Sequence, residues 1–135
     1  MKMSLRKEIR RARRGDVRAQ RQLGDFYAEE NTSHTDYKEA VRWYGFAMKK
    51  GDLKAKFEIG RIFDSERIEG ERTKAIGVRY FKELAEDGYP TAQYIMGMKY
   101  YFGDGVEKDR VLSVKWLRKA EAQGLAEAKR QLENM

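Results

Sequence analysis

The sequence predicts an all-α protein made of repeated helix pairs, and two observations carry this prediction. Four glycines recur at intervals of 36, 37 and 36 residues: Gly15, Gly51, Gly88 and Gly124. The residue types at fixed distances before and after these glycines also match from one repeat to the next. Eight such matching positions, called columns below, are found when the glycines themselves are counted. Periods of this length are typical of helical repeat proteins, in which each repeat is one supersecondary unit.

The columns after each boundary glycine predict the first helix of a repeat. Ala stands four positions on, a large apolar residue eight positions on and, in three units, an aromatic residue twelve positions on. These side chains therefore share one stripe of a helix. A second glycine recurs nine positions on, as Gly24, Gly60 and Gly97. Glycine inside a helix costs about 1 kcal/mol relative to alanine, so its recurrence predicts a close approach of the second helix at this point.

The columns before the next boundary glycine predict the second helix. They place a small residue, a Trp or Tyr and an Ala or Leu at spacings of three and four, which is the buried stripe of a helix. The aromatic column consists of Trp43, Tyr80 and Trp116. Asp36 and Asp109 stand where a side chain would cap the start of this helix. The boundary glycine suits the left-handed residue that ends it.

These columns divide the chain, in order, into a set of expected elements. Residues 1–14 are expected to form a basic helix like the second half of a missing repeat, with Leu5, Ile9 and Ala12 on one face. A C-terminal capping helix is expected at residues 124–135. Between these helices, three repeats are expected over residues 15–50, 51–87 and 88–123. We expect residues 1–135 to form a single domain, in keeping with their number.

The repeat strings resemble a known family. The third repeat reads GYPTAQYIMGMKYYFGDGVEKDRVLSVKWLRKAEAQG over residues 88–124, and the first contains GDVRAQRQLGDFY and DYKEAVRWYGFAMKKG. Both closely resemble Sel1-like repeats, which are relatives of tetratricopeptide repeats. The middle repeat departs from the pattern, since Tyr80 replaces Trp and one residue is inserted. The resemblance implies a right-handed α-α superhelix, or solenoid, of about three repeats with flanking terminal helices. It also implies a non-enzymatic adaptor or scaffold that binds proteins or peptides.

Composition narrows the function classes. The 135 residues contain no Cys and a single His, which argues against thiol catalysis, Cys-ligated zinc and His-based metal sites. We therefore expect no enzyme, no catalytic residue, no metal and no cofactor, and we expect His34, in a polar loop, to be solvated. No apolar run approaches the roughly 18 residues of a membrane span. No apolar segment follows the basic start either, so we expect no secretory signal and a cytoplasmic location.

The resemblance to tetratricopeptide grooves predicts which residues face a partner on the concave side. Counted from the boundary glycine, they lie at positions three, six, ten and thirteen of each first helix. The basic members suit an acidic or carboxylate-bearing segment, and Phe57, Tyr94 and Tyr101 suit apolar anchors. Phe57 and Tyr94 also fit packing between neighbouring repeats. The predicted groove residues are Arg18, Arg21, Asp25, Lys54, Phe57, Arg61, Asp64, Tyr94, Met98, Tyr101 and Arg130.

The net charge is concentrated at one end of the chain. Residues 1–21 contain nine Lys or Arg against two acidic residues and so carry the whole net charge of +7. The basic patch consists of Arg6, Lys7, Arg10, Arg11, Arg13 and Arg14. Contacts from this patch to phosphates would bind nucleic acid in a salt-sensitive manner, which is one alternative function. The patch could also steer an acidic protein, lie on an anionic membrane or simply be solvated.

Two further alternatives concern the partner. The chain could be a specific inhibitor or immunity partner of a toxin, a role implied by some bacterial relatives. It could also form a homodimer through a terminal repeat, because the ends of a short stack expose helix faces.

Overall fold

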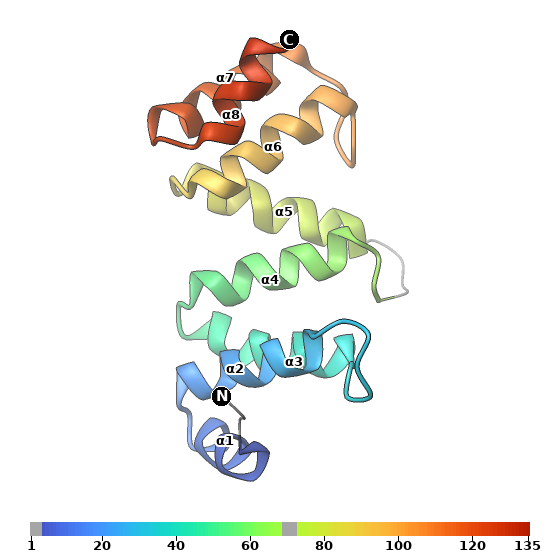
Figure 1. Cartoon of the computed structure of the whole chain (residues 1–135), viewed down its shortest axis with the longest axis vertical. Helices are drawn as coiled ribbons and strands as arrows, with labels where there is room; N and C mark the ends of the chain where they lie inside the picture. Colours follow the sequence, from blue (N-terminus) through green and yellow to red (C-terminus); the bar gives the residue numbers. More distant parts are fainter. Residues whose placement is uncertain (1–3, 69–72) are drawn as a thin grey trace. The chain divides into compact units, whose positions relative to one another are not determined.

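The structure is a computed structural model that describes residues 4–68 and 73–135. The chain divides into two compact units, Met1–Glu71 and Arg72–Met135, called unit 1 and unit 2 below. Every regular element in the described residues is an α-helix (Figure 1). This confirms the all-α prediction.

Each unit contains four helices in its described part, and each helix packs against the next one along the unit. Those of unit 1 are α1 (Leu5–Arg13), α2 (Val17–Ala28), α3 (Tyr37–Lys49) and α4 (Leu53–Asp64). Those of unit 2 are α5 (Thr73–Glu86), α6 (Pro90–Phe102), α7 (Arg110–Ala122) and α8 (Ala126–Glu133).

The core of each unit contains residues that the sequence columns select, together with large side chains that the columns missed. Tyr44, Phe81 and Leu117, each directly after the aromatic column, are fully buried, whereas Tyr80 of that column is only partly buried. In unit 1 a buried cluster joins α1, α2 and α3, with Ile9 and Tyr27 packed against it: Ala12, Ala19, Leu23 and Trp43. In unit 2 a buried cluster joins α7 and α8: Leu117, Ala120 and Ala128. The alternation of small and large side chains lets neighbouring helices pack closely while excluding water.

The boundary glycines end helices as predicted. Gly15, Gly51, Gly88 and Gly124 have φ values of +98°, +93°, +96° and +92°. The residue after each glycine donates its backbone N–H to the carbonyl five positions back, for example from Asp16 to Arg11 at 3.1 Å and from Tyr89 to Leu84 at 3.0 Å. This is the Schellman arrangement, which supplies donors to the last carbonyls of the helix.

Aspartate side chains cap the starts of helices in both units. Asp36 accepts a hydrogen bond from the Glu39 amide at 3.1 Å, and Asp109 accepts one from the Leu112 amide at 3.0 Å. Both caps confirm the prediction. Two further caps, Asp16 at the start of α2 and Asp52 at the start of α4, follow boundary glycines directly.

The glycines inside α2 and α6 mark the close approach that their recurrence predicts. A Cβ at Gly24 would overlap the ring of Tyr44 on α3. A Cβ at Gly97 would lie 2.7 Å from Leu117 Cγ on α7. In each case the second helix of the pair occupies the space that a side chain would need.

Two buried glutamines, which the sequence columns did not include, bind helix ends. The Gln20 side chain donates to the Ala12 carbonyl at 3.0 Å, and the Gln93 side chain donates to the Ala85 carbonyl at 3.2 Å. Each glutamine stands five positions after a boundary glycine, and each acceptor stands three positions before it. The bonds therefore join the end of one helix to the start of the next at equivalent places in the two units.

A second pair of side-chain bonds also repeats. Lys50 Nζ donates to the Gly15 carbonyl in unit 1. Gln123 Nε2 donates to the Gly88 carbonyl at 2.8 Å in unit 2. Both donors stand one position before a boundary glycine and reach back 35 residues, so each bond closes one repeat.

Candidate functional site

In unit 1 the predicted groove residues lie on α2 and α4. Arg18, Lys54 and Arg61 are exposed, whereas Phe57 and Asp64 are partly buried. The three exposed cations therefore present charge to solvent from the two first helices of this unit.

Arg21 is committed to the fold of unit 1. Its Nε lies 3.2 Å from Asp52 Oδ2, and the side chain of Asp52 in turn caps α4. The ion pair ties the middle of α2 to the start of α4. Arg21 is thus less free to meet a partner than Arg18 or Lys54.

Asp25 is likewise engaged within unit 1. The hydroxyl of buried Tyr44 donates to Asp25 Oδ1 at 2.5 Å. Burial, together with this hydrogen bond and the charge of Asp25, raises the pKa of Tyr44 well above its ordinary value of 10.0. Tyr44 therefore stays a hydrogen-bond donor, and Asp25 acts as its acceptor.

A polar cavity of about 250 Å³, the α4 cavity, lies next to Arg61. It is formed by the end of α2, the start of α3, the second half of α4 and the residues that follow α4. Its lining is Ala28, Glu30, Tyr37, Glu58, Arg61, Ile62, Ser65 and Arg67.

Ion pairs organise the rim of the α4 cavity. Arg67 Nη2 lies 2.7 Å from Glu30 Oε1, and Arg67 also donates to the Tyr37 hydroxyl at 3.2 Å. Arg61 Nη1 lies 3.3 Å from Glu58 Oε2. The lining thus offers two guanidinium groups and two carboxylates, which suits a polar or charged side chain of a partner.

Glu58 contributes a partly buried carboxylate to this lining. Burial raises the pKa of its carboxyl above the ordinary value of 4.5, and the nearby Arg61 guanidinium opposes that rise. Loop residues Glu30 and Arg67 belong to no repeat column, which is why the sequence columns did not find this cavity.

In unit 2 the predicted groove residues lie on α6 and α8. Tyr94 and Met98 pack, partly buried, against the cluster that joins α7 and α8. Tyr101 meets the exposed ring of Phe102 edge to face, with centroids 5.0 Å apart. Arg130 lies 3.7 Å from Glu127 on the same helix.

The basic patch lies on α1 and the residue that caps its end. The side chains of Arg6, Lys7, Arg10, Arg13 and Arg14 are exposed. Arg11, also exposed, pairs with Glu8 at 3.2 Å.

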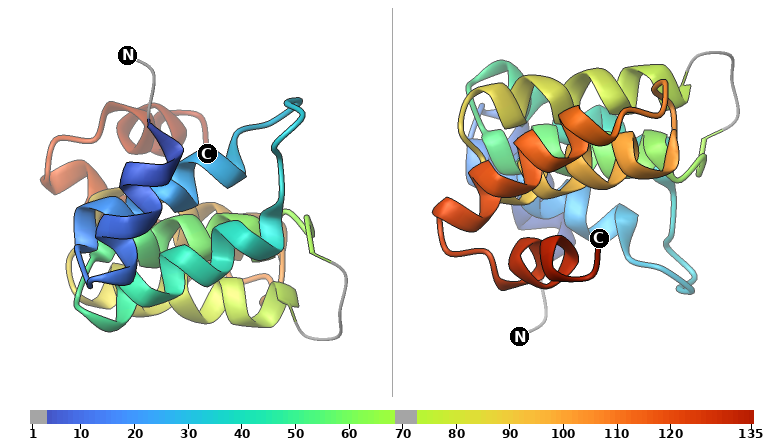
Figure 2. Two further views of the ribbon diagram at one scale, coloured as in Figure 1. Left: turned by 90° about the horizontal axis from the view of Figure 1, so that it is seen from below. Right: turned by 90° about the horizontal axis from the view of Figure 1, so that it is seen from above.

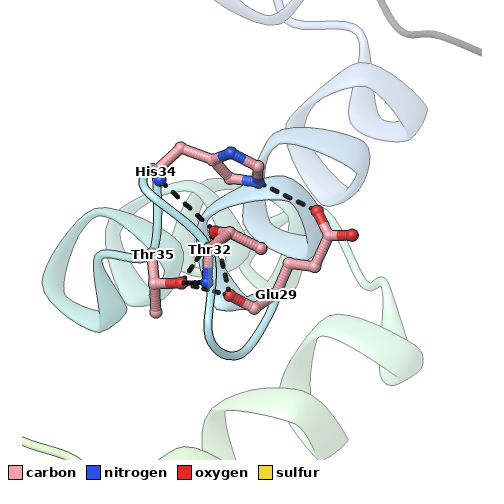
Figure 3. A network of polar contacts seen from close by, with 4 residues as sticks. All are labelled: Glu29, Thr32, His34 and Thr35. Carbon is pink, nitrogen blue, oxygen red and sulfur yellow. Dashed lines mark hydrogen bonds and ion pairs between the residues drawn. The ribbon is translucent and has the colours of Figure 1, made fainter.

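The His34 side chain, expected to be solvated, is 31% exposed but also makes specific contacts. His34 lies in the connection between α2 and α3, and this connection projects beyond the helix ends (Figure 2). Its ring stacks on Phe26 with centroids 3.8 Å apart, and its Nε2 lies 2.9 Å from Glu29 Oε2 (Figure 3). Thr35 donates to the Glu29 carbonyl, and its hydroxyl lies 2.8 Å from that of Thr32. The imidazole is therefore part of an ordered polar network.

Within 4–68 and 73–135, no group of three or more His, Cys, Asp or Glu side chains is placed to hold a metal ion. In the same residues, no helix has the length and apolar character needed to cross a bilayer.

The repeat columns, the helix pairs and the boundary glycines point to one family. The family model for the Sel1 repeat matches residues 17–52 and 90–125. The chain belongs to the Sel1 repeat family. Sel1 repeats are generally protein–protein interaction modules, and proteins built from them are generally non-enzymatic scaffolds.

Solved structures agree with this assignment and confirm the α-solenoid fold class. The crystal structure of a Sel1 repeat protein from Oxalobacter formigenes is similar, with a TM-score of 0.75 and 33% identity. The match covers 97% of this chain and 98% of that one. No curated protein matches the chain.

A second solved structure is that of c5321, a protective antigen present in uropathogenic Escherichia coli strains, which displays a Sel1-like repeat fold. The similarity has a TM-score of 0.81 and 34% identity over 95% of this chain. This chain spans 27% of that protein.

Proposed function

We propose that this Sel1 repeat chain binds an acidic segment of a protein partner on the first helices of unit 1, without catalysis. One observation carries the proposal: the exposed cations Arg18, Lys54 and Arg61 stand on α2 and α4, and Arg61 borders the α4 cavity. Exposed guanidinium and ammonium groups are suited to carboxylates, and a guanidinium binds a carboxylate through two parallel hydrogen bonds.

Arg61 is available for such a contact although it pairs with Glu58. The pair is formed between residues three apart on α4, and the Arg61 side chain is 61% exposed. Exposed pairs of this kind contribute only about 0.3–0.5 kcal/mol. A partner carboxylate can therefore compete with Glu58 for Arg61, while Arg21 and Asp25 keep their contacts within unit 1.

The α4 cavity supplies a place for one side chain of the same segment. Its volume of about 250 Å³ is comparable with the size of a single large residue. Ile62 and Ala28 contribute apolar wall, and the Tyr37 and Ser65 hydroxyls contribute hydrogen-bonding groups. The other lining residues are charged, so the cavity suits a polar side chain more than an apolar one.

Unit 2 offers apolar contacts by itself. Tyr101 and the exposed Phe102 present two adjoining aromatic rings at the end of α6. Aromatic side chains of this kind are common anchors in protein interfaces. Tyr94 and Met98 contribute only their exposed edges, because their other atoms pack within unit 2.

The proposal is tested by selecting peptides from a phage-displayed random library on the immobilised full chain. We expect the selected peptides to be enriched in Asp and Glu. The affinity of one synthesised peptide is then measured by isothermal titration calorimetry for the unchanged chain and for Arg18→Gln/Lys54→Gln/Arg61→Gln. We expect the triple variant to bind roughly tenfold to hundredfold more weakly, because each exposed charge pair contributes up to about 1 kcal/mol.

A matched control removes three exposed cations from second helices: Lys38→Gln/Lys49→Gln/Lys82→Gln. It lowers the net charge by the same amount and should leave the peptide affinity within about twofold. Equal losses in the two triple variants, or selected peptides without acidic enrichment, would contradict the proposed site.

A further inference from the structure

Helix α1 is held in a fixed orientation by unit 1. Ala12 is buried in the cluster with Ala19, Leu23 and Trp43, and Ile9 packs against the same cluster. The apolar stripe of α1 is therefore used for folding. The cations on the rest of its surface remain turned toward solvent.

These cations surround a hollow of about 480 Å³. It is lined by Arg6, Ile9, Arg10, Arg13 and Arg14, so four of its five residues carry a guanidinium group. No other side chain contributes to its lining within the described part of the chain.

The positive charge of this surface is not compensated within unit 1. Glu8 is the acidic residue of α1, and it pairs with Arg11 at 3.2 Å. Over residues 4–68 and 73–135, no ion pair engages Arg6, Lys7, Arg10, Arg13 or Arg14. Five like charges side by side on a short helix repel one another, so a polyanion that neutralises them is bound favourably.

The length of the charged row indicates a polymer and not a single anion. Residues 6 to 14 span about 12 Å of helix at about 1.5 Å per residue. Duplex nucleic acid carries one phosphate charge for about every 1.7 Å of its axis, or about seven over that length. These phosphates belong to both strands, so the five cations can each find one where α1 lies along a groove and reaches the two strands that border it.

We propose that α1 binds the phosphodiester backbone of duplex nucleic acid without reading its sequence. Three properties of α1 favour this ligand. Its cations have the length and spacing for a backbone, and it has no aromatic residue on which an unpaired base could stack. Leu5, at 36% exposure, is its single exposed large apolar residue in the described range, too little for insertion into a lipid surface.

The proposal is tested by fluorescence anisotropy with the full chain and a labelled duplex DNA of about 20 base pairs. Binding should be tight at about 50 mM NaCl and weaken with a slope of about −4 to −5 in log affinity against log salt, at about 0.9 per phosphate neutralised. The affinity should thus fall several hundredfold by about 200 mM NaCl. DNA duplexes of unrelated sequence should bind alike.

The variant Arg6→Gln/Arg10→Gln/Arg13→Gln should bind at least tenfold more weakly at about 50 mM NaCl, with a slope shallower by about 2.7. The control Lys82→Gln/Arg110→Gln/Arg118→Gln removes the same charge from exposed positions of unit 2 and should retain most of the affinity. The urea midpoints of the unchanged chain and the two triple variants should be equal, which shows that a loss of DNA affinity does not come from unfolding.

Three results would overturn the proposal. They are absence of DNA binding at low salt, equal losses in both triple variants, and tighter binding to vesicles of phosphatidylcholine with phosphatidylserine than to the duplex. The residues changed here are not those of the acidic-peptide site, so the two proposals succeed or fail separately.

Discussion

Two helix glycines of unit 1, Gly24 and Gly45, differ in what surrounds them. The Tyr44 ring occupies the Cβ position of Gly24, whereas nothing lies within 4 Å of a Cβ at Gly45. The same substitution should therefore have opposite effects at the two positions, although both residues lie inside helices.

We expect Gly24→Ala to lower the free energy of unfolding by about 1–2 kcal/mol. Overpacking costs about 1–3 kcal/mol, and alanine recovers up to about 1 kcal/mol of helix propensity. Gly45→Ala should raise the free energy of unfolding by about 0.5–1 kcal/mol. Urea denaturation followed by circular dichroism measures both. Stabilisation by Gly24→Ala would show that α2 and α3 do not approach as described.

Some contacts of polar residues could not be predicted from the sequence. Gln20 and Gln93 share a position in their repeats, but Lys56 occupies it in the middle repeat and Lys129 occupies it in the C-terminal helix. A column half Gln and half Lys looks like a solvated surface position. His34 could not be placed either, because its stacking on Phe26 depends on how residues 29–36 fold back.

At the scale of elements, the turn after α6 is anchored to two helices of unit 2. Asp104 Oδ1 lies 2.6 Å from Lys74 Nζ on α5, and Asp104 Oδ2 lies 3.1 Å from Lys99 Nζ on α6. The Lys99 side chain is only 4% exposed. The hydrogen bonds from these two lysines lower the pKa of the Asp104 carboxyl below its ordinary value of 3.8.

We expect Asp104→Asn to lower the free energy of unfolding at pH 7 by about 1 kcal/mol, because buried Lys99 loses a carboxylate partner. The folded-state pKa of Asp104 is depressed, so its stabilisation is fully present above pH 3.8 and is lost as the pH falls through the folded-state value. The difference from the unchanged chain should therefore shrink below that pH. Urea titrations at pH 7 and about pH 3 measure it.

The control for this element is Asp87→Asn, which removes an exposed carboxylate just after α5. It should change the free energy of unfolding by less than about 0.5 kcal/mol at both pH values. A loss as large as that of Asp104→Asn would mean that net charge, and not the anchored turn, sets the effect.

Helices and their ends were predictable because they depend on contacts near in sequence. Asp36 and Asp109 were expected as caps, and the boundary glycines were expected in the left-handed conformation. Asp16 and Asp52 carry the same signal, an Asp directly before an apolar-periodic helix, and were available to the same reasoning.

At the scale of the whole molecule, each unit contains one of the two tryptophans. Trp43 in unit 1 and Trp116 in unit 2 are 5% and 7% exposed. In repeat proteins, stability is approximately a sum of repeat terms and nearest-neighbour terms. A local change should therefore be felt most by the unit that carries it.

We expect Gly97→Ala, which would press on Leu117, to shift the urea midpoint of Trp116 fluorescence more than that of Trp43. The backgrounds Trp43→Phe and Trp116→Phe leave a single reporter in unit 2 and unit 1, respectively. Identical shifts from both reporters would contradict a response confined to neighbouring repeats.

The fold class was predictable at this scale because many columns repeat the same information. The candidate site was predictable only in part. Arg18, Lys54 and Arg61 lie on first helices as the repeat register requires, but the α4 cavity owes its rim to Glu30 and Arg67. These residues lie in irregular connections, where neighbouring repeats share no pattern.

The bonds from Lys50 to Gly15 and from Gln123 to Gly88 bear on how such a chain lengthens over evolution. Donor and acceptor are 35 residues apart, almost one full period. Duplication of one whole period in a gene would thus copy the donor together with a new acceptor. Growth by complete periods therefore preserves every such bond.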